Sequence, residues 1–225
     1  VTFVTGGDPD FETSNAIIKT MIQNQTDIIE IGMPFSDPMA DGPTIQLSSN
    51  RAINNGADLN NIFKLVSNAK IINSKIPIIL MGYYNLILHF GINNFVSNCV
   101  SSGVDGLIIV DLQPEEDEDL LTELNKNNIA LIRLITPTTD EKRLKLILKN
   151  ASGFLYFVSV MGTTGQKSAD INELKKSIDF IKKHTEMPVI PGFGIKNSED
   201  VNNICKIADG AVVGSSIIKI IEENL

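Results

Sequence analysis

Short runs of apolar residues recur along this chain of 225 residues, and longer amphipathic stretches separate them. Within each run the apolar residues are continuous rather than alternating, which is typical of parallel strands buried on both faces. We expect eight strands, over 1–5, 28–32, 76–81, 106–110, 129–135, 154–158, 189–191 and 211–213. This alternation predicts an α/β fold, a parallel eight-stranded (β/α)8 or TIM barrel, with an open doubly wound sheet as the alternative.

The amphipathic stretches predict the helices that cover such a barrel. We expect helices over 11–23, 44–54, 59–73, 92–102, 115–125, 141–149, 172–184, 198–207 and 215–224. No linker or low-complexity tract interrupts the pattern, so we expect residues 1–225 to form a single barrel domain. In a barrel of this kind the functional residues lie in the loops that leave the carboxyl ends of the strands.

The composition excludes several classes of protein. The formal net charge is −8, and the 19 Lys and Arg residues are scattered, whereas nucleic-acid surfaces need clustered positive charge. No apolar run reaches the roughly 18 residues that cross a membrane. Cys99 and Cys205 stand apart, without a CxxC or Cys/His group, which excludes a disulfide framework and a structural zinc site. We expect a soluble cytoplasmic protein with no metal, nucleic-acid or membrane partner.

One carboxylate interrupts the second apolar run. Glu30 stands between Ile29 and Ile31, and side chains alternate along a strand, so Glu30 points into the barrel if the isoleucines face the helices. Burial disfavours the charged form and should raise the pKa of Glu30 toward the range useful for proton transfer. Glu30 is therefore a candidate catalytic residue; the alternative is a structural glutamate paired with a lysine or a strand-end amide.

The loop after this strand is long for a connection between a strand and a helix. Residues 33–44 read MPFSDPMADGPT, with three prolines and two aspartates. Proline fixes φ and lowers the entropy of a loop, so we expect an ordered segment. Asp41 with Gly42 predicts either a turn at a helix start or a second carboxylate at the site.

Glycine follows two neighbouring strands late in the chain. PGFGI at 191–195 precedes one expected helix, and VGSS at 213–216 opens directly into another. Glycine permits close approach of the backbone, and a helix N-terminus presents unpaired N–H groups to an anion. Barrels commonly hold phosphate at these loops, so the turns predict a phosphate-ester ligand, with no Lys or Arg in either segment. The glycines and threonines of 159–168 suit a mobile lid, or else an ordinary surface loop.

A set of short segments carries a family resemblance. They are VTGGDP near the start, IIEIG followed by PFSDPMADGPTIQ, then LMGYYN, DLQPEE, VMGTTG, PGFGI and GSSIIKIIE. In this order they resemble the tryptophan synthase α subunit family over essentially all 225 residues. The PFSDPMADGPTIQ block is highly specific, whereas many phosphate-binding barrels share the glycine turns.

The resemblance implies a lyase of L-tryptophan biosynthesis that cleaves indole-3-glycerol phosphate by a retro-aldol step into indole and glyceraldehyde 3-phosphate. Glu30 matches the family's catalytic glutamate, and Asp41 matches its catalytic aspartate. The step removes the proton of the glycerol 3′-hydroxyl and protonates indole C3, and a carboxyl with a raised pKa can serve both transfers. Asp41 would accept a hydrogen bond from the indole N–H as positive charge develops on the ring.

The resemblance also implies the walls of the site. Tyr156 matches a tyrosine near the glycerol and Glu30. The indole pocket is expected at Phe3, Met81, Tyr83, Ile108, Leu134 and Phe193. The phosphate contacts are expected at Thr164, Gly165, Phe193, Gly194, Gly214 and Ser215.

A partner is implied as well. Chains of the family work with a β subunit in an α2β2 complex, and that subunit holds pyridoxal phosphate and consumes the indole, so we expect no cofactor in this chain. Residues 34–37 would face the partner. We expect the family's leading helix, before Val1, and its final helix, after Leu225, to be absent. Val160 and Met161 stand where the lid usually has polar or small residues.

Two other functions stay open. One is a different phosphate-binding barrel enzyme of the same pathway, such as indole-glycerol-phosphate synthase or a phosphoribosyl isomerase, which use a lysine or paired acids at other strand ends. The other is a non-catalytic allosteric partner subunit, against which Glu30, Asp41 and both glycine turns argue. An assay for indole release separates all three.

Overall fold

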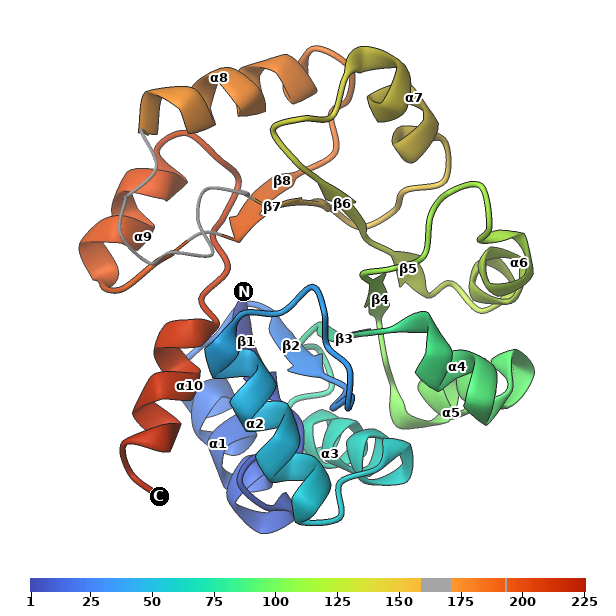
Figure 1. Ribbon diagram of the computed structural model, residues 1–225, viewed down its shortest axis with the longest axis vertical. Helices are drawn as coiled ribbons and strands as arrows, with labels where there is room; N and C mark the ends of the chain where they lie inside the picture. The colour runs from blue at the N-terminus through green and yellow to red at the C-terminus, as the bar shows by residue number, and fades with distance from the viewer. Residues whose placement is uncertain (159–170, 193) are drawn as a thin grey trace.

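Parallel strands form a ring at the centre of the molecule, with helices around it (Figure 1). The computed structural model describes residues 1–158, 171–192 and 194–225. A five-stranded sheet has the order β1-β2-β3-β4-β5, and a three-stranded sheet has the order β6-β7-β8. The strands are β1 Thr2–Thr5, β2 Ile29–Gly32, β3 Ile78–Gly82, β4 Gly106–Ile109, β5 Ala130–Leu131, β6 Arg133–Ile135, β7 Leu155–Val158 and β8 Val189–Gly192.

The expected strand over 129–135 is two short strands that meet at Ile132. The Ile132 N–H donates to the Leu107 carbonyl of β4 at 2.9 Å, so pairing on that side continues through the break. Beyond it, β6 pairs with β7 in the register Arg133↔Leu155. Strands of a barrel are staggered, and one apolar run therefore pairs with its two neighbours along different parts of its length.

The last apolar run closes the ring. Val213 bridges Thr2 of β1, and Val212 bridges Gly192 of β8, both in parallel. The Phe3 N–H donates to the Val213 carbonyl at 2.8 Å, so β1 is hydrogen-bonded to the last apolar run. The run expected as the strand 211–213 is thus a pair of bridges, and the closed barrel is confirmed over the open sheet.

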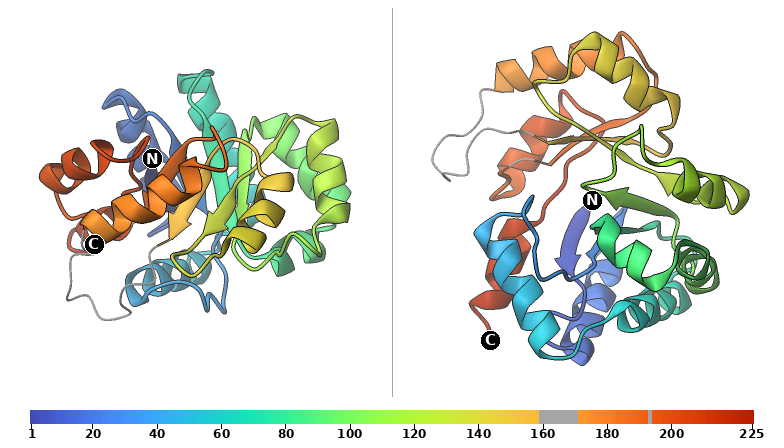
Figure 2. Two further views of the ribbon diagram at one scale, coloured as in Figure 1. Left: turned by 90° about the horizontal axis from the view of Figure 1, so that it is seen from above. Right: turned by 45° about the vertical axis from the view of Figure 1, so that its right-hand side comes forward.

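The helices lie on the outside of the ring in every view (Figure 2). Most begin and end within two residues of the expected positions, but the helix expected over 115–125 begins three residues later, at Glu118, after Asp117 turns inward to pair with Arg133. The helix α4 was not expected, because seven residues are too few to show a helical period. The helices are α1 Phe11–Gln23, α2 Pro43–Asn54, α3 Leu59–Ile72, α4 Tyr84–Phe90, α5 Ile92–Ser102, α6 Glu118–Lys126, α7 Glu141–Lys149, α8 Ile171–Lys182, α9 Ser198–Cys205 and α10 Ser215–Glu222.

Side-chain caps fix several helix starts. Asp10, Asp58, Asp140 and Asn197 each accept a hydrogen bond from the backbone N–H three residues later. This bond satisfies one of the N–H groups that the first turn leaves without a partner. Short polar residues before each amphipathic stretch therefore set where α1, α3, α7 and α9 begin.

The strands separate two apolar layers. Ile29 and Ile31 of β2 pack outward in the cluster shared with the helices. A second cluster fills the inside of the ring, with Ile79, Ile108, Ile132, Phe154, Ile190 and Val212. The residue between Ile29 and Ile31 therefore faces inward. No helix within the described ranges is long and apolar enough to span a bilayer.

An ion-pair group holds α2 and α10 beside the loop after β1. The Arg51 guanidinium of α2 donates to both oxygens of the buried Asp8 carboxylate, at 2.8 and 2.9 Å. Its Nη1 atom also lies 3.5 Å from a carboxylate oxygen of Glu222 in α10. Because α2 follows the β2 loop and α10 follows the 211–213 segment, these contacts fix two helices that border the same end of the ring.

Candidate active site

Glu30 lies inside the barrel, as its place in the sequence predicts. Its register partners are Phe3 of β1 and Ile79 of β3. The side chain is fully buried. It borders a cavity of about 450 Å³ that opens at the carboxyl ends of the strands.

The Glu30 carboxyl has an environment suited to proton transfer. Neither of its oxygens has a hydrogen-bond partner in the part of the chain that the structure describes. Burial raises its pKa to about 8, and the nearby Asp41 carboxylate adds to the rise. A carboxyl with such a pKa can hold or release a proton near neutral pH. A ligand in the cavity can supply the missing partners.

Asp41 borders the same cavity from the loop between β2 and α2. Its Oδ2 atom accepts a hydrogen bond from the Tyr83 hydroxyl at 3.0 Å. Burial raises the pKa of Asp41, and the bond from Tyr83 opposes that rise. Asp41 and Gly42 also lie at a helix start, as the turn interpretation predicts, since Gly42 is the N-cap of α2 and Pro43 begins the helix.

Tyr156 of β7 faces the cavity beside the end of β8. A β-carbon placed on Gly192 would lie 2.4 Å from its ring, so only glycine leaves room for the tyrosine. Burial raises the pKa of Tyr156 far above its ordinary value, and the Glu30 and Asp41 carboxylates raise it further. The phenol therefore stays protonated and can donate a hydrogen bond.

The expected indole-pocket residues do not all line the cavity. Phe3 and Met81 line it. Tyr83 lines a small adjoining cavity of about 20 Å³, which Asp41 also borders. Ile108 belongs to the packed cluster inside the ring, and Leu134 packs against that cluster. Phe193 lies outside the described residues.

The far end of the cavity is built from the two glycine turns. Gly194, Gly214 and Ser215 all line it. Helix α10 begins at Ser215, and Gly214 supplies no side-chain cap, so its first N–H groups are left for a ligand. The Ser216 hydroxyl donates to the Ile195 carbonyl and ties the two turns together. Thr164, Gly165 and the expected lid 159–168 lie outside the described residues.

Two lysines at this end were missed in the sequence. Lys196 and Lys219 line the cavity, and both are exposed. Lys196 directly follows the segment 191–195, and Lys219 lies four residues after Ser215, one helical turn further on. Extending each segment by a helical turn finds both. Their charges favour an anion beside the two glycine turns.

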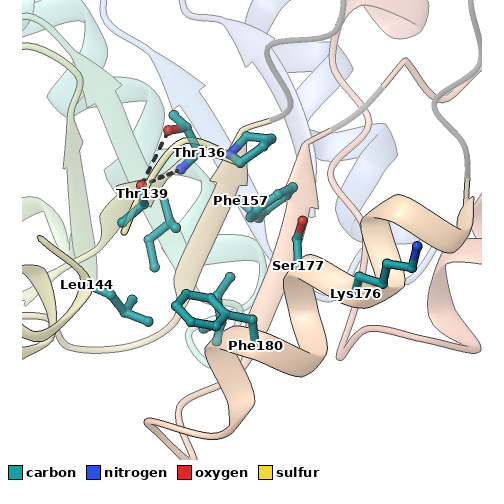
Figure 3. Close-up of a pocket in the computed structure, with 10 residues that line it drawn as sticks. Thr136, Thr139, Leu144, Phe157, Lys176, Ser177 and Phe180 are labelled. Carbon is teal, nitrogen blue, oxygen red and sulfur yellow. Dashed lines mark hydrogen bonds between the residues drawn. The ribbon is translucent and has the colours of Figure 1, made fainter. Parts of the chain in front are cut away.

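A second cavity lies outside the barrel, between the ends of β6 and β7 and the helices α7 and α8 (Figure 3). It measures about 290 Å³, and Phe157, Phe180 and Leu144 form its apolar wall. It holds none of the predicted site residues. Within the described ranges, no group of three or more His, Cys, Asp or Glu side chains is placed to hold a metal ion.

Comparison with known proteins places these features in a family. The family model of the tryptophan synthase alpha chain matches residues 1–225. The chain is similar to tryptophan synthase subunit alpha of Legionella pneumophila, at 34% identity over 99% of this chain and 82% of that one, with a TM-score of 0.92. It is also similar to a chain of the Pyrococcus furiosus tryptophan synthase α2β2 complex, at 36% identity over 99% and 89% of the two chains, with a TM-score of 0.90.

Proposed function

The chain belongs to the tryptophan synthase alpha chain family, and from this premise we propose that Glu30 and Asp41 act on the substrate in the barrel cavity. The family's reaction is the retro-aldol cleavage of indole-3-glycerol phosphate to indole and glyceraldehyde 3-phosphate, a lyase step of tryptophan biosynthesis. The observation that carries the proposal is the buried Glu30 carboxyl, which faces the cavity and has no partner among the described residues.

The reaction moves one proton overall. The bond between indole C3 and the glycerol C3′ breaks, and its electron pair stays with the indole. The C3′ hydroxyl loses its proton and becomes the aldehyde of glyceraldehyde 3-phosphate, while C3 gains a proton. We assign both transfers to Glu30, because a carboxyl with a pKa of about 8 is present in both forms near neutral pH.

Asp41 stabilises the positive charge that develops on the indole ring. As C3 is protonated, the indole nitrogen becomes more positive and its N–H becomes a stronger donor. A carboxylate that accepts this hydrogen bond stabilises the transition state more than the bound substrate. The position of Asp41 on the wall that also holds Glu30 supports this role.

The rest of the cavity fits the rest of the substrate. Phe3 and Met81 offer apolar surface for the indole, and Tyr156 offers a hydroxyl near Glu30. Gly194, Gly214 and Ser215 offer backbone groups for the phosphate, and Lys196 and Lys219 add positive charge. The cavity wall thus combines carboxyl groups, apolar surface and cations, as a ligand with an indole and a phosphate requires.

The chain works with a β subunit, as chains of this family do in the α2β2 complex. The pyridoxal phosphate of that complex belongs to the β subunit, and the α reaction uses no cofactor. We propose that residues 34–37 face the partner, because this segment belongs to the same loop as Asp41. We also propose that residues 1–225 act as one domain in the cytoplasm, which the free thiols of Cys99 and Cys205 support.

Indole release from indole-3-glycerol phosphate tests the proposal. The wild-type chain with a β subunit should release indole, and Glu30→Gln should remove nearly all of that activity while leaving substrate binding largely intact. Gln keeps the size of the side chain but cannot exchange a proton. A variant that keeps its kcat would overturn the role of Glu30. Indole release also separates this function from a non-catalytic subunit, which would release none.

A further inference from the structure

Tyr83 lies between the end of β3 and the loop that carries Asp41. It follows β3 directly, precedes α4, and is 4% exposed. The Ala40 N–H donates to its hydroxyl oxygen at 3.0 Å. The hydroxyl lies 3.0 Å from Oδ2 of Asp41. One phenol oxygen therefore joins two consecutive residues of the β2–α2 loop.

The direction of these bonds is fixed by the groups involved. A backbone N–H can only donate, so the bond from Ala40 uses a lone pair of the phenol oxygen. The phenol has a single proton, and an ionised Asp41 can only accept. The Tyr83 proton is thus aimed at Oδ2 of Asp41, which leaves Oδ1 to accept from a ligand in the cavity.

The Tyr83 ring holds a third point of the same loop. The Phe35 ring stacks on it, with 5.1 Å between the centroids and 30° between the planes. Phe35, Ala40 and Asp41 span most of the loop between β2 and α2. Tyr83 thus attaches the β2–α2 loop to the end of β3. The position of the Asp41 carboxylate therefore depends on this contact as well as on the loop itself.

We propose that Tyr83 is a positioning residue for the cleavage reaction, whose hydroxyl orients the Asp41 carboxylate toward the indole N–H. This inference rests on the proposed role of Asp41. The expectation that Tyr83 also lines the indole pocket stays a prediction, since Tyr83 borders a small cavity that shares Phe3, Asp41 and Met81 with the larger one.

The electrostatics agree with the geometry. Burial raises the pKa of Asp41, and the hydrogen bond from Tyr83 lowers it. The pKa of Tyr83 itself is raised by burial and then by Asp41, and the more distant Asp111 adds to it, so the phenol stays a donor. Among the described residues, the other charged or titratable groups that border the cavity with Asp41 are Glu30, Tyr156, Lys196 and Lys219. Removing the Tyr83 hydroxyl leaves these in place and should raise the pKa of Asp41.

The test is Tyr83→Phe, which keeps the ring and its stacking and deletes the hydroxyl. We expect kcat for indole release to fall about tenfold, since a hydrogen bond to a charged group is lost, with little change in KM. The acid limb of the kcat–pH profile should move to higher pH by about one unit. The control is Tyr84→Phe on the neighbouring tyrosine, which is half-buried and should leave kcat and the profile unchanged.

A double-mutant cycle separates positioning from a general structural role. In an Asp41→Asn background, Tyr83→Phe should lower kcat by less than about twofold, because the carboxylate through which it acts is gone. An equal tenfold loss in both backgrounds, or an unchanged kcat and acid limb in Tyr83→Phe alone, overturns the proposal. An Asp41→Asn chain with wild-type kcat would instead overturn the role of Asp41 itself. Melting curves of all variants show whether each is folded.

Discussion

The Tyr156 ring lies so close to the backbone of Gly192 that a β-carbon at that position would stand 2.4 Å from both Cε1 and the hydroxyl oxygen. Gly192 does not have a positive φ, so the requirement for glycine there comes from space and not from backbone conformation. The Tyr156 ring thus packs against the backbone at the end of β8, close to Glu30.

Gly192→Ala should therefore displace Tyr156. We expect a loss of about 1–3 kcal/mol in the free energy of unfolding, the usual cost of overpacking, and a lower kcat/KM. Adding Tyr156→Leu to that variant removes the overlapping ring and should restore part of the stability. Thermal melting of the single and double variants measures both effects. Gly210→Ala is the control, since its β-carbon would meet nothing closer than 3.6 Å; an equal loss there would contradict the argument.

Glu30 should make the stability of the wild-type chain depend on pH. Its pKa is about 8 in the folded chain against an ordinary 4.5, so between these values the folded state holds a proton that the unfolded state has lost. Stability should fall as the pH rises through this window, by roughly 5 kcal/mol in all.

Glu30→Gln removes that slope. The melting temperature of the variant minus that of the wild type should increase from pH 5 to about pH 8 and then level off. Glu118→Gln, on the exposed start of α6, is the control and should follow the wild type at every pH. Parallel curves for Glu30→Gln and the wild type would show that the carboxyl does not hold its proton in the folded chain.

A negative charge at the start of α10 should weaken phosphate binding. In Gly214→Asp, like charges meet at close range, and we expect KM for indole-3-glycerol phosphate to rise about tenfold or more. Gly214→Ala is the matched control. Its β-carbon would come no closer than 3.4 Å to Phe3, so KM should change little. Similar KM values for the two variants would place the phosphate elsewhere.

Lys196 and Lys219 should contribute to substrate binding through their positive charge alone. Replacing both by Gln should raise KM about three- to tenfold at low salt, because exposed charges attract the phosphate only over a distance of about 10 Å. The difference from the wild type should shrink as salt is added, while kcat stays the same. Lys206→Gln, after the end of α9, is the control, because Lys206 is exposed and contacts Asn203. A salt-independent effect would contradict a purely electrostatic role.

The sequence predicts this fold well where the information is local. Continuous apolar runs locate the strands, and short polar caps locate helix starts. The inward direction of Glu30 follows from two isoleucines and the period of a strand. These features depend on neighbours a few residues apart, which a single sequence displays directly.

Depth within the barrel is a different kind of information. Ile108, Leu134 and Met81 all belong to the inside of the ring, yet of these only Met81 reaches the cavity. Their depth depends on the stagger of neighbouring strands, which no single run contains. The hydrogen bonds of Tyr83 are equally remote from its own segment of the sequence. Its contacts come from a loop some forty residues earlier in the chain.

The bridges from Val213 to Thr2 and from Val212 to Gly192 have a consequence for the order of folding. The first of them joins the two ends of the barrel sequence, and closing so long a loop has a high cost in chain entropy. Phe3, Gly192, Val212 and Gly214, which lie at this seam, all border the cavity. The binding site therefore depends on a contact between the two ends of the barrel sequence, and it is complete only when the ring is closed.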